Sequence, residues 1–282
     1  MIKPPGTWIA IASAILCLQL STSSTRADYL VGVSYTSGQL VSIDPLTGEG
    51  TQAGSLPTGV APYGLAMQGG NLYTFDAAAN GIRVVDPATG STSSPISIGT
   101  TPALGQGGLA FRSDGVGFLN TILDPDTFDV LNNLYSFNLS TGTSTLIGRT
   151  IPTLAGLAFV DNVLYGLGKL DNTIYTIDTT TALATIVGNL FADPNDPDAA
   201  LGSPIESLTS GPNGQLFATL DDRLFKIDVA TGRASAVGSS GIGFSSISGI
   251  TYVSTVPEPS SILLVGIGMA AIFGCRRSRR PR

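Results

Sequence analysis

The sequence predicts an all-β fold, a β-propeller built from four-stranded blades. Three observations support this prediction. One phrase returns five times along the chain, a second phrase precedes it in most units, and the two ends of the repeat array complement each other. A fixed repeat period of this kind decides the architecture before any single residue is considered.

The first repeated phrase is a short apolar strand that ends in Asp or Asn, followed by Thr-Gly or Thr-Ala three residues later. It occurs at Leu40–Gly48, Ile82–Gly90, Leu134–Gly142, Ile174–Ala182 and Leu224–Gly232. The successive spacings are 42, 52, 40 and 50 residues. These values match the roughly 40 to 50 residues of a four-stranded propeller blade. Each copy is therefore interpreted as strand three of a blade.

The second phrase supplies strands one and two. It reads Gly-Leu-Ala with an apolar residue, then a turn and another apolar segment, as in Gly64–Tyr73, Gly108–Phe118 and Gly156–Tyr165; Glu206–Phe217 is a looser copy. The turns contain Gly, Asn, Asp or Pro, which tolerate positive φ or preset a turn. Strand four follows the Thr-Gly step and ends near a glycine, as in Ser144–Gly148, Ala184–Gly188 and Ser235–Gly238. No segment has a convincing helical period.

The ends of the array predict a closed ring. The first unit begins with Tyr29–Tyr35, which corresponds to strand two, whereas Ile247–Tyr252 resembles a strand one with nothing after it. Closure by the C-terminal strand would remove free sheet edges. Five blades are the predicted count. Six blades, with one hidden in the insertions, are the alternative, and an open β-solenoid is disfavoured because the ends are complementary.

The Asp-Pro-x-Thr-Gly phrase is interpreted as a turn between strands three and four rather than as a catalytic motif. Asp side chains bond backbone amides two residues on, Pro presets φ, and Gly accepts a left-handed conformation. The recurrent aromatic residues are interpreted as core or inter-blade packing for the same positional reason: Tyr73, Tyr135, Tyr165, Tyr175, Phe217 and Phe225.

Residues 1–27 are predicted to be a signal peptide. Lys3 precedes an apolar run from Trp8 to Leu20, and a polar segment leads to Thr25-Arg26-Ala27, which favours cleavage after Ala27. A membrane anchor is the alternative, disfavoured because the apolar run is short and a Ser/Thr-rich segment follows it.

Residues 255–282 form a second targeting segment. Pro257-Glu258-Pro259 is followed by an apolar stretch from Ile262 to Cys275 and then by five arginines within residues 276–282. The apolar stretch is shorter than the about 20 residues that span a bilayer comfortably, and the arginines favour the cytoplasmic side. This arrangement resembles the PEP-CTERM sorting signal of Gram-negative bacteria. The resemblance implies recognition by an exosortase and a link with exopolysaccharide, but says nothing about activity.

The remaining segment, residues 28–254, is the predicted propeller domain. Residues 28–256 carry seven basic and nineteen acidic side chains, a net charge of −12, whereas the whole chain carries −6. This acidity disfavours nucleic acid and anionic membrane surfaces as partners. Both cysteines, Cys17 and Cys275, lie in the targeting segments, so no disulfide is expected in the domain.

The residue types available limit catalysis. The chain has no histidine, and residues 28–254 have no cysteine, which removes Ser-His-Asp and Cys-His sites and the ordinary zinc sites. A carboxylate pair could still hydrolyse or eliminate a glycan. Such a pair in a central pocket with aromatic walls would favour an enzyme, whereas dispersed acids would favour a binding protein.

Long insertions are expected on one face of the ring, at residues 92–107, 120–132 and 189–204. Their acidic residues, with two more between strands two and three of the last unit, are the candidate binding-face residues: Asp124, Asp126, Asp129, Asp193, Asp196, Asp198, Asp221 and Asp222. Clustered carboxylates suit Ca²⁺, but the spacing is not that of an EF-hand, and solvated loops are the favoured interpretation. No cofactor is predicted.

The sequence thus predicts an exported, exosortase-sorted propeller without enzymatic activity. Signal peptidase and exosortase would act during export, with the C-terminal helix as the sole, transient contact with the inner membrane. The mature domain would then reach the cell surface or extracellular matrix and bind polysaccharide, or a protein, through its long-loop face. A carboxylate-based glycan hydrolase or lyase is the alternative.

Overall fold

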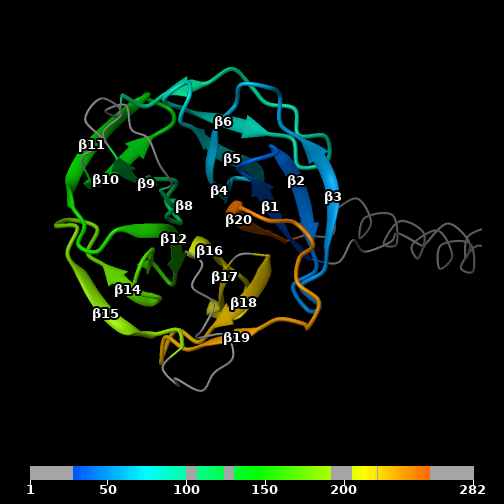
Figure 1. Ribbon diagram of the computed structural model, residues 1–282. Coiled ribbons are helices and arrows are strands. Elements are labelled where there is room, and N and C mark those ends of the chain that lie inside the picture. The colour runs from blue at the N-terminus through cyan, green and yellow to red at the C-terminus, as the bar shows by residue number, and fades with distance from the viewer. Residues whose placement is uncertain (1–27, 100–106, 124–129, 192–204, 221, 255–282) are drawn as a thin grey trace, which may run out of the picture. The chain divides into compact units, whose positions relative to one another are not determined.

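The computed structural model describes residues 28–99, 107–123, 130–191, 205–220 and 222–254. Residues Asp28–Val253 form one compact unit, and Figure 1 shows it as a ring of β-sheets. There are five sheets, each with four strands. All of the strand pairings within them are antiparallel. The chain is therefore a five-bladed β-propeller, as the repeat predicted, and not the six-bladed alternative.

Within a blade the strands follow one another from the axis of the ring to its rim. Blade 1 contains β20 (Ile247–Val253), β1 (Tyr29–Ser34), β2 (Gln39–Ile43) and β3 (Gly50–Ser55). Blade 2 contains β4 (Pro62–Gln68), β5 (Asn71–Asp76), β6 (Gly81–Val85) and β7 (Ile96–Ser97). Blade 3 contains β8 (Leu109–Phe111), β9 (Gly117–Leu123), β10 (Val130–Asn138) and β11 (Thr143–Arg149).

The last two blades repeat this order. Blade 4 contains β12 (Leu154–Val160), β13 (Val163–Gly168), β14 (Thr173–Ile177) and β15 (Ala184–Asn189). Blade 5 contains β16 (Ile205–Ser210), β17 (Leu216–Leu220), β18 (Arg223–Ile227) and β19 (Ala234–Ala236), with the short 3-10 turn η1 (Pro212–Gly214) between its first two strands. Among the described residues, no helix has the length and apolarity needed to cross a membrane.

The ring closes in blade 1, where the two ends of the unit meet in one sheet. Strand β20 pairs with β1 in antiparallel register, with Tyr29 opposite Val253 and Gly32 opposite Ile250. Two side-chain hydrogen bonds extend the joint to the neighbouring blades: Thr219 Oγ1 donates to the Ile247 carbonyl at 3.1 Å, and Ser248 Oγ to the Pro62 carbonyl at 3.2 Å. The predicted closure by the C-terminal strand is confirmed.

The hydrophobic core lies between blades rather than within them. Five clusters of buried side chains are present in the described residues, and each one draws on two adjacent blades. In the cluster between blades 4 and 5, Leu167 and Ile174 pack with Leu216 and Phe225. The other clusters join blades 1 and 2, 2 and 3, 3 and 4, and 5 and 1. No blade can bury its apolar faces alone, which is the physical reason for a closed ring.

The repeated Asp or Asn forms the turn between the third and fourth strands. Asp44 Oδ1 accepts a hydrogen bond from the Leu46 amide at 2.7 Å and from the Thr47 amide at 3.3 Å. The same pair of bonds recurs at Asp86, Asn138, Asp178 and Asp228. Hydrogen bonds to Thr180 and Thr181 lower the pKa of Asp178 to about 2. The structural interpretation of this phrase is confirmed.

Glycines bring the innermost strands together at the axis. A Cβ on Gly64, whose φ is +68°, would lie 2.8 Å from the Leu109 amide nitrogen, and one on Gly249 would lie 2.8 Å from the Gly64 carbonyl carbon. Gly108 and Gly156 approach the next inner strand in the same way. The glycine of the Gly-Leu-Ala phrase is thus required by close backbone approach.

Removal of residues 244–253 is expected to unfold the domain. It deletes β20, including Ile247 and Ile250, which are 0% and 1% exposed. Each large buried apolar side chain contributes about 1.5–3 kcal/mol, and a domain has a total stability of only about 5–15 kcal/mol. The measurement is thermal unfolding by circular dichroism of residues 28–253 and of the truncated chain. An unchanged melting temperature would show that ring closure is not required.

Candidate functional site

The strand order places the connections on two faces of the ring. Links between strands one and two and between three and four emerge on one face, here called the turn face. Links between strands two and three, and from strand four to the next blade, emerge on the other, here called the long-loop face. The strand ends that face the links between β7 and β8, β9 and β10, and β15 and β16 lie at the long-loop face, and residues 100–106, 124–129 and 192–204 within these links are outside the described residues.

Most of the acidic residues predicted to mark the binding site lie outside the described residues. These are Asp124, Asp126, Asp129, Asp193, Asp196, Asp198 and Asp221. Asp222 is described: it lies between β17 and β18, on the long-loop face, and its carbonyl accepts a hydrogen bond from the Ile242 amide. In the described part of the chain, no group of three or more acidic, His or Cys side chains could hold a metal ion.

The insertion expected at residues 92–107 is shorter in the structure than in the prediction. Ile96 and Ser97 form β7, the outer strand of blade 2, and Ile98 is buried between blades 2 and 3. The sequence did not reveal this strand because it is only two residues long and is preceded by the polar segment 91–95, Ser-Thr-Ser-Ser-Pro.

One buried carboxylate is present near the long-loop face, and its contacts are structural. Asp76 is fully buried and forms an ion pair with Arg83, with 2.7 Å between Oδ2 and Nε. Its other oxygen accepts hydrogen bonds from the amides of Ala61 and Ala78 at 3.0 and 3.1 Å. Both oxygens have partners within the protein, so Asp76 secures the link between blades 1 and 2.

Near the same face, three buried polar atoms have no hydrogen-bond partner among the described residues: Asn120 Nδ2, Thr121 Oγ1 and Asn132 Oδ1. They belong to the end of β9 and the start of β10, close to residues 124–129. Tyr35 and Tyr63 also lie on this face, stacked with ring centroids 5.0 Å apart. Burial and the neighbouring Tyr35 hydroxyl raise the pKa of Tyr63 above its usual range.

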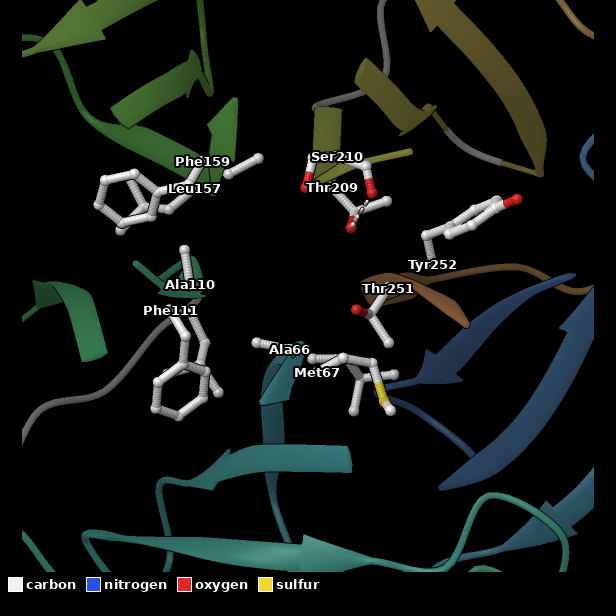
Figure 2. A pocket seen from close by; sticks show the side chains of 13 residues that line it. Ala66, Met67, Ala110, Phe111, Leu157, Phe159, Thr209, Ser210, Thr251 and Tyr252 are labelled. Carbon is white, nitrogen blue, oxygen red and sulfur yellow. Dashed lines mark hydrogen bonds between the residues drawn. The ribbon is translucent and has the colours of Figure 1, made fainter. Parts of the chain in front are cut away.

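The described hollow at the centre of the ring opens toward the turn face. It has a volume of about 90 Å³ and is lined by the ends of all five inner strands. Figure 2 shows small side chains nearest the opening, with the Thr209 and Thr251 hydroxyls on one side and the methyl groups of Ala66 and Ala110 on the other. Deeper along the axis, at the level of the glycines, there is no space for a water molecule.

The rim of this hollow is formed by one repeat position. Three residues after each inner-strand glycine, or after Ser207 in blade 5, stand Met67, Phe111, Phe159, Ser210 and Tyr252. All five are partly buried, and in Figure 2 the rings of Phe111, Phe159 and Tyr252 point away from the opening. In the sequence these residues share a fixed spacing of three from a repeated glycine. That spacing alone did not show that the position borders a hollow.

The rim offers surface and hydrogen-bonding groups but little acid–base chemistry. Tyr252 is the ionisable residue among those lining the central hollow, and its hydroxyl donates to Asp28 Oδ2 at 2.7 Å. Burial and the Asp28 carboxylate raise the pKa of Tyr252 to about 12, so the phenol remains protonated at neutral pH.

Beside the central hollow lies a second, shallower one of about 530 Å³ on the turn face, here called the side hollow. It is lined by Phe111, Ser113, Phe159, Asp161 and Asn162, which belong to blades 3 and 4. Phe111 and Phe159 line both hollows. An aromatic wall with a hydroxyl, an amide and a carboxylate is suited to bind a small polar ligand.

Comparison with known proteins gives different information for the two parts of the chain. Among the similar solved structures is a symmetrical protein from a study of de novo evolutionary emergence, with 17% identity over 82% of this chain and 100% of that one and a TM-score of 0.52. A chain of a nidogen/laminin complex has 15% identity over 82% of this chain and 100% of that one, with a TM-score of 0.50. A gluconolactonase-like protein has 12% identity over 77% of this chain and 80% of that one, with a TM-score of 0.50. At this identity the likeness concerns the fold alone.

No curated protein matches the sequence. The model of the PEP-CTERM protein-sorting motif matches residues 255–280, including Pro257, Glu258 and Pro259. The chain therefore combines a five-bladed β-propeller with a C-terminal PEP-CTERM sorting motif.

Proposed function

We propose that this protein is exported, sorted by an exosortase, and retained at the cell surface or in the extracellular matrix as a binding protein without enzymatic activity. The sorting motif at residues 255–280 supports export and membrane-anchored sorting. In this proposal residues 1–27 are a signal peptide cleaved after Ala27, residues 28–254 are the propeller domain, and residues 255–282 are the sorting segment.

The positions of the two proposed cleavage sites, relative to the strands, support removal of both targeting segments. The compact unit spans Asp28–Val253, and Tyr29 pairs with Val253 in the closing sheet. Cleavage after Ala27 and near Pro257 would leave every strand and every inter-blade cluster in place. The acidic, cysteine-free domain then depends on packing alone once it has left the membrane.

The observation that favours binding over catalysis is the lining of the central hollow. Its lining residues include no carboxylate, and the side hollow contributes one, Asp161. Glycoside hydrolysis requires two carboxyl groups flanking the bond that breaks. This geometry supports recognition of a polysaccharide without cleavage of it.

Polysaccharide is the preferred ligand class, with a protein as the second. The resemblance of residues 255–282 to PEP-CTERM signals suggests exopolysaccharide, and Phe111 and Phe159 add aromatic residues to the lining of the side hollow. The long-loop face, with its acidic loops, is the second candidate surface and suits a ligand that tolerates negative charge.

Processing at both ends is the first expected result. Intact-mass and N-terminal analysis of the protein from cells with an active exosortase should give a chain that begins at Asp28 and lacks the arginines of residues 276–282. The matched control is a Pro257→Ala, Glu258→Ala, Pro259→Ala variant, which should retain the C-terminal segment and stay in the membrane fraction. An intact C-terminus in the unmodified protein would contradict sorting.

Binding without cleavage is the second expected result. Residues 28–253 should migrate more slowly in native gels that contain the exopolysaccharide of the producing cells. Prolonged incubation of the two should release no new reducing or unsaturated chain ends. Release of such ends, with their loss in an Asp161→Asn variant, would support the hydrolase or lyase alternative. A heat-unfolded sample serves as the control for non-specific retardation.

The acidic loops are expected to act as surface charge, so Ca²⁺ should give no specific stabilisation. A ligand at 100 times its dissociation constant stabilises a protein by about 2.7 kcal/mol, and for this size of domain each kcal/mol raises the melting midpoint by roughly 2–4 °C. Melts in EDTA, CaCl₂, MgCl₂ and NaCl of matched ionic strength should give equal midpoints. A rise of several degrees with CaCl₂ alone would identify a calcium site instead.

A further inference from the structure

Two phenylalanine rings on neighbouring inner strands flank the side hollow. Phe111 ends β8 in blade 3, and Phe159 occupies the equivalent position of β12 in blade 4. Figure 2 shows both rings on the same side of the central opening, one from each strand. Both phenylalanines line the hollow of about 530 Å³ between blades 3 and 4, one from each blade.

The rings are held in place before any ligand arrives. The Phe111 ring lies 5.3 Å from that of Tyr73 and 5.6 Å from that of Phe137, measured between centroids. Phe159 packs edge-on against Phe118, with centroids 5.2 Å apart. A ligand that stacks on these rings loses little affinity to the ordering of side chains.

Polar groups complete the hollow. Ser113 Oγ donates to Asn162 Oδ1 at 2.9 Å, a bond that links the first turns of blades 3 and 4. Asp161 and Asn162 form the tight turn after β12, with φ of 47° and 66°, and Val160 pairs with Val163 across it. The turn presents an amide and a carboxylate beside the aromatic rings, on a backbone that cannot shift easily.

This combination matches the chemistry of a sugar ring. A pyranose has an apolar face of C–H groups, which packs on an aromatic ring, and hydroxyls at its edge, which exchange hydrogen bonds with amide, hydroxyl and carboxylate groups. The charge of the site favours a neutral sugar. The lining residues include the acidic Asp161 and no Lys or Arg, and the adjacent Arg112 is paired with Asp114 at 2.8 Å.

We propose that the side hollow binds one neutral sugar residue of a polysaccharide chain, stacked on Phe111 or Phe159 and hydrogen-bonded by Ser113, Asp161 and Asn162. This inference rests on the proposed function in taking polysaccharide as the ligand, but it places the ligand on the turn face rather than on the long-loop face. The chain can continue in both directions from a shallow hollow of this kind.

The other blades show why the site is single. At the same repeat position blade 2 has Met67 and blade 5 has Ser210, so neither neighbouring gap is flanked by two aromatic rings. Blade 1 has Tyr252, whose hydroxyl is occupied by Asp28. Blades 3 and 4 are the adjacent pair that carries phenylalanine at both positions, so in the described part of the chain this combination occurs at one hollow.

Met67 also supplies the matched substitution for the test. Because methionine occupies this position in blade 2, Phe111→Met and Phe159→Met should preserve the inner strands while removing the aromatic faces. Affinity electrophoresis of residues 28–253 would use a neutral glucan, a neutral mannan and anionic alginate in the gel. We expect binding to at least one neutral polysaccharide, at least tenfold weaker for each methionine variant, and no binding to alginate.

Two further substitutions are at exposed residues and leave the core packing unchanged. Ser113 and Asn162 are exposed, so Ser113→Ala and Asn162→Asp should leave the melting temperature unchanged. Asn162→Asp keeps a residue that tolerates positive φ but replaces the amide donor by a second carboxylate. Each should weaken neutral-polysaccharide binding about threefold or more. Tyr35→Met, which removes an exposed aromatic ring from the long-loop face, is the control and should bind like the unmodified protein.

The results of these experiments distinguish failure of the side-hollow site from failure of the proposed polysaccharide-binding function. Binding that survives in all four side-hollow variants but falls in Tyr35→Met would overturn the site and leave polysaccharide recognition intact. Tighter binding to alginate than to the neutral polymers would overturn the choice of a neutral sugar. Failure of the unmodified protein to bind any polysaccharide, including that of its own cells, would overturn both proposals.

Discussion

Every part of this propeller depends on apolar layers that two blades share. Each buried cluster in the described structure takes its side chains from adjacent sheets, so a single blade has no core of its own. A linear array of such units would leave two apolar faces in water, one at each end. Pairing of β20 with β1 removes both ends at once and makes the stability of each interface a property of the whole ring.

The same packing explains the geometry of the centre. To bring five apolar interfaces together, the inner strands must approach one another so closely that glycine is needed at Gly64, Gly108, Gly156 and Gly249. Among the described residues the axis is closed at that level, and a hollow opens beyond it toward the turn face. Residues just beyond the glycines can therefore vary without disturbing the ring, and it is there that Met67, Phe111, Phe159, Ser210 and Tyr252 differ.

The closed ring is compatible with the proposed export of the domain. The described unit runs from Asp28 to Val253, and Tyr29 lies opposite Val253 in the closing sheet, so removal of the residues before and after the unit would interrupt no blade. Stability comes from packing and from repeated Asp and Asn turns rather than from disulfides. In the proposed function, an acidic surface and a hollow lined by two phenylalanines and one carboxylate would discourage adhesion to anionic polymers while permitting contact with a neutral one.

The sequence by itself determined the repeat, the number of blades, the closure by Ile247–Tyr252, the turn role of Asp44 and its counterparts, and the sorting motif. Each of these is a local pattern that recurs or stands at an end of the chain, so its physical cause can be recognised without coordinates. The sequence pointed to the acidic insertions as the site, because loops and clustered carboxylates are conspicuous in one dimension. Only the tertiary structure decided that Phe111 and Phe159, 48 residues apart, border the same hollow with Ser113 and Asn162. That proximity arises because neighbouring blades pack face to face around an axis, and the distance of a side chain from that axis is set by all five blades together.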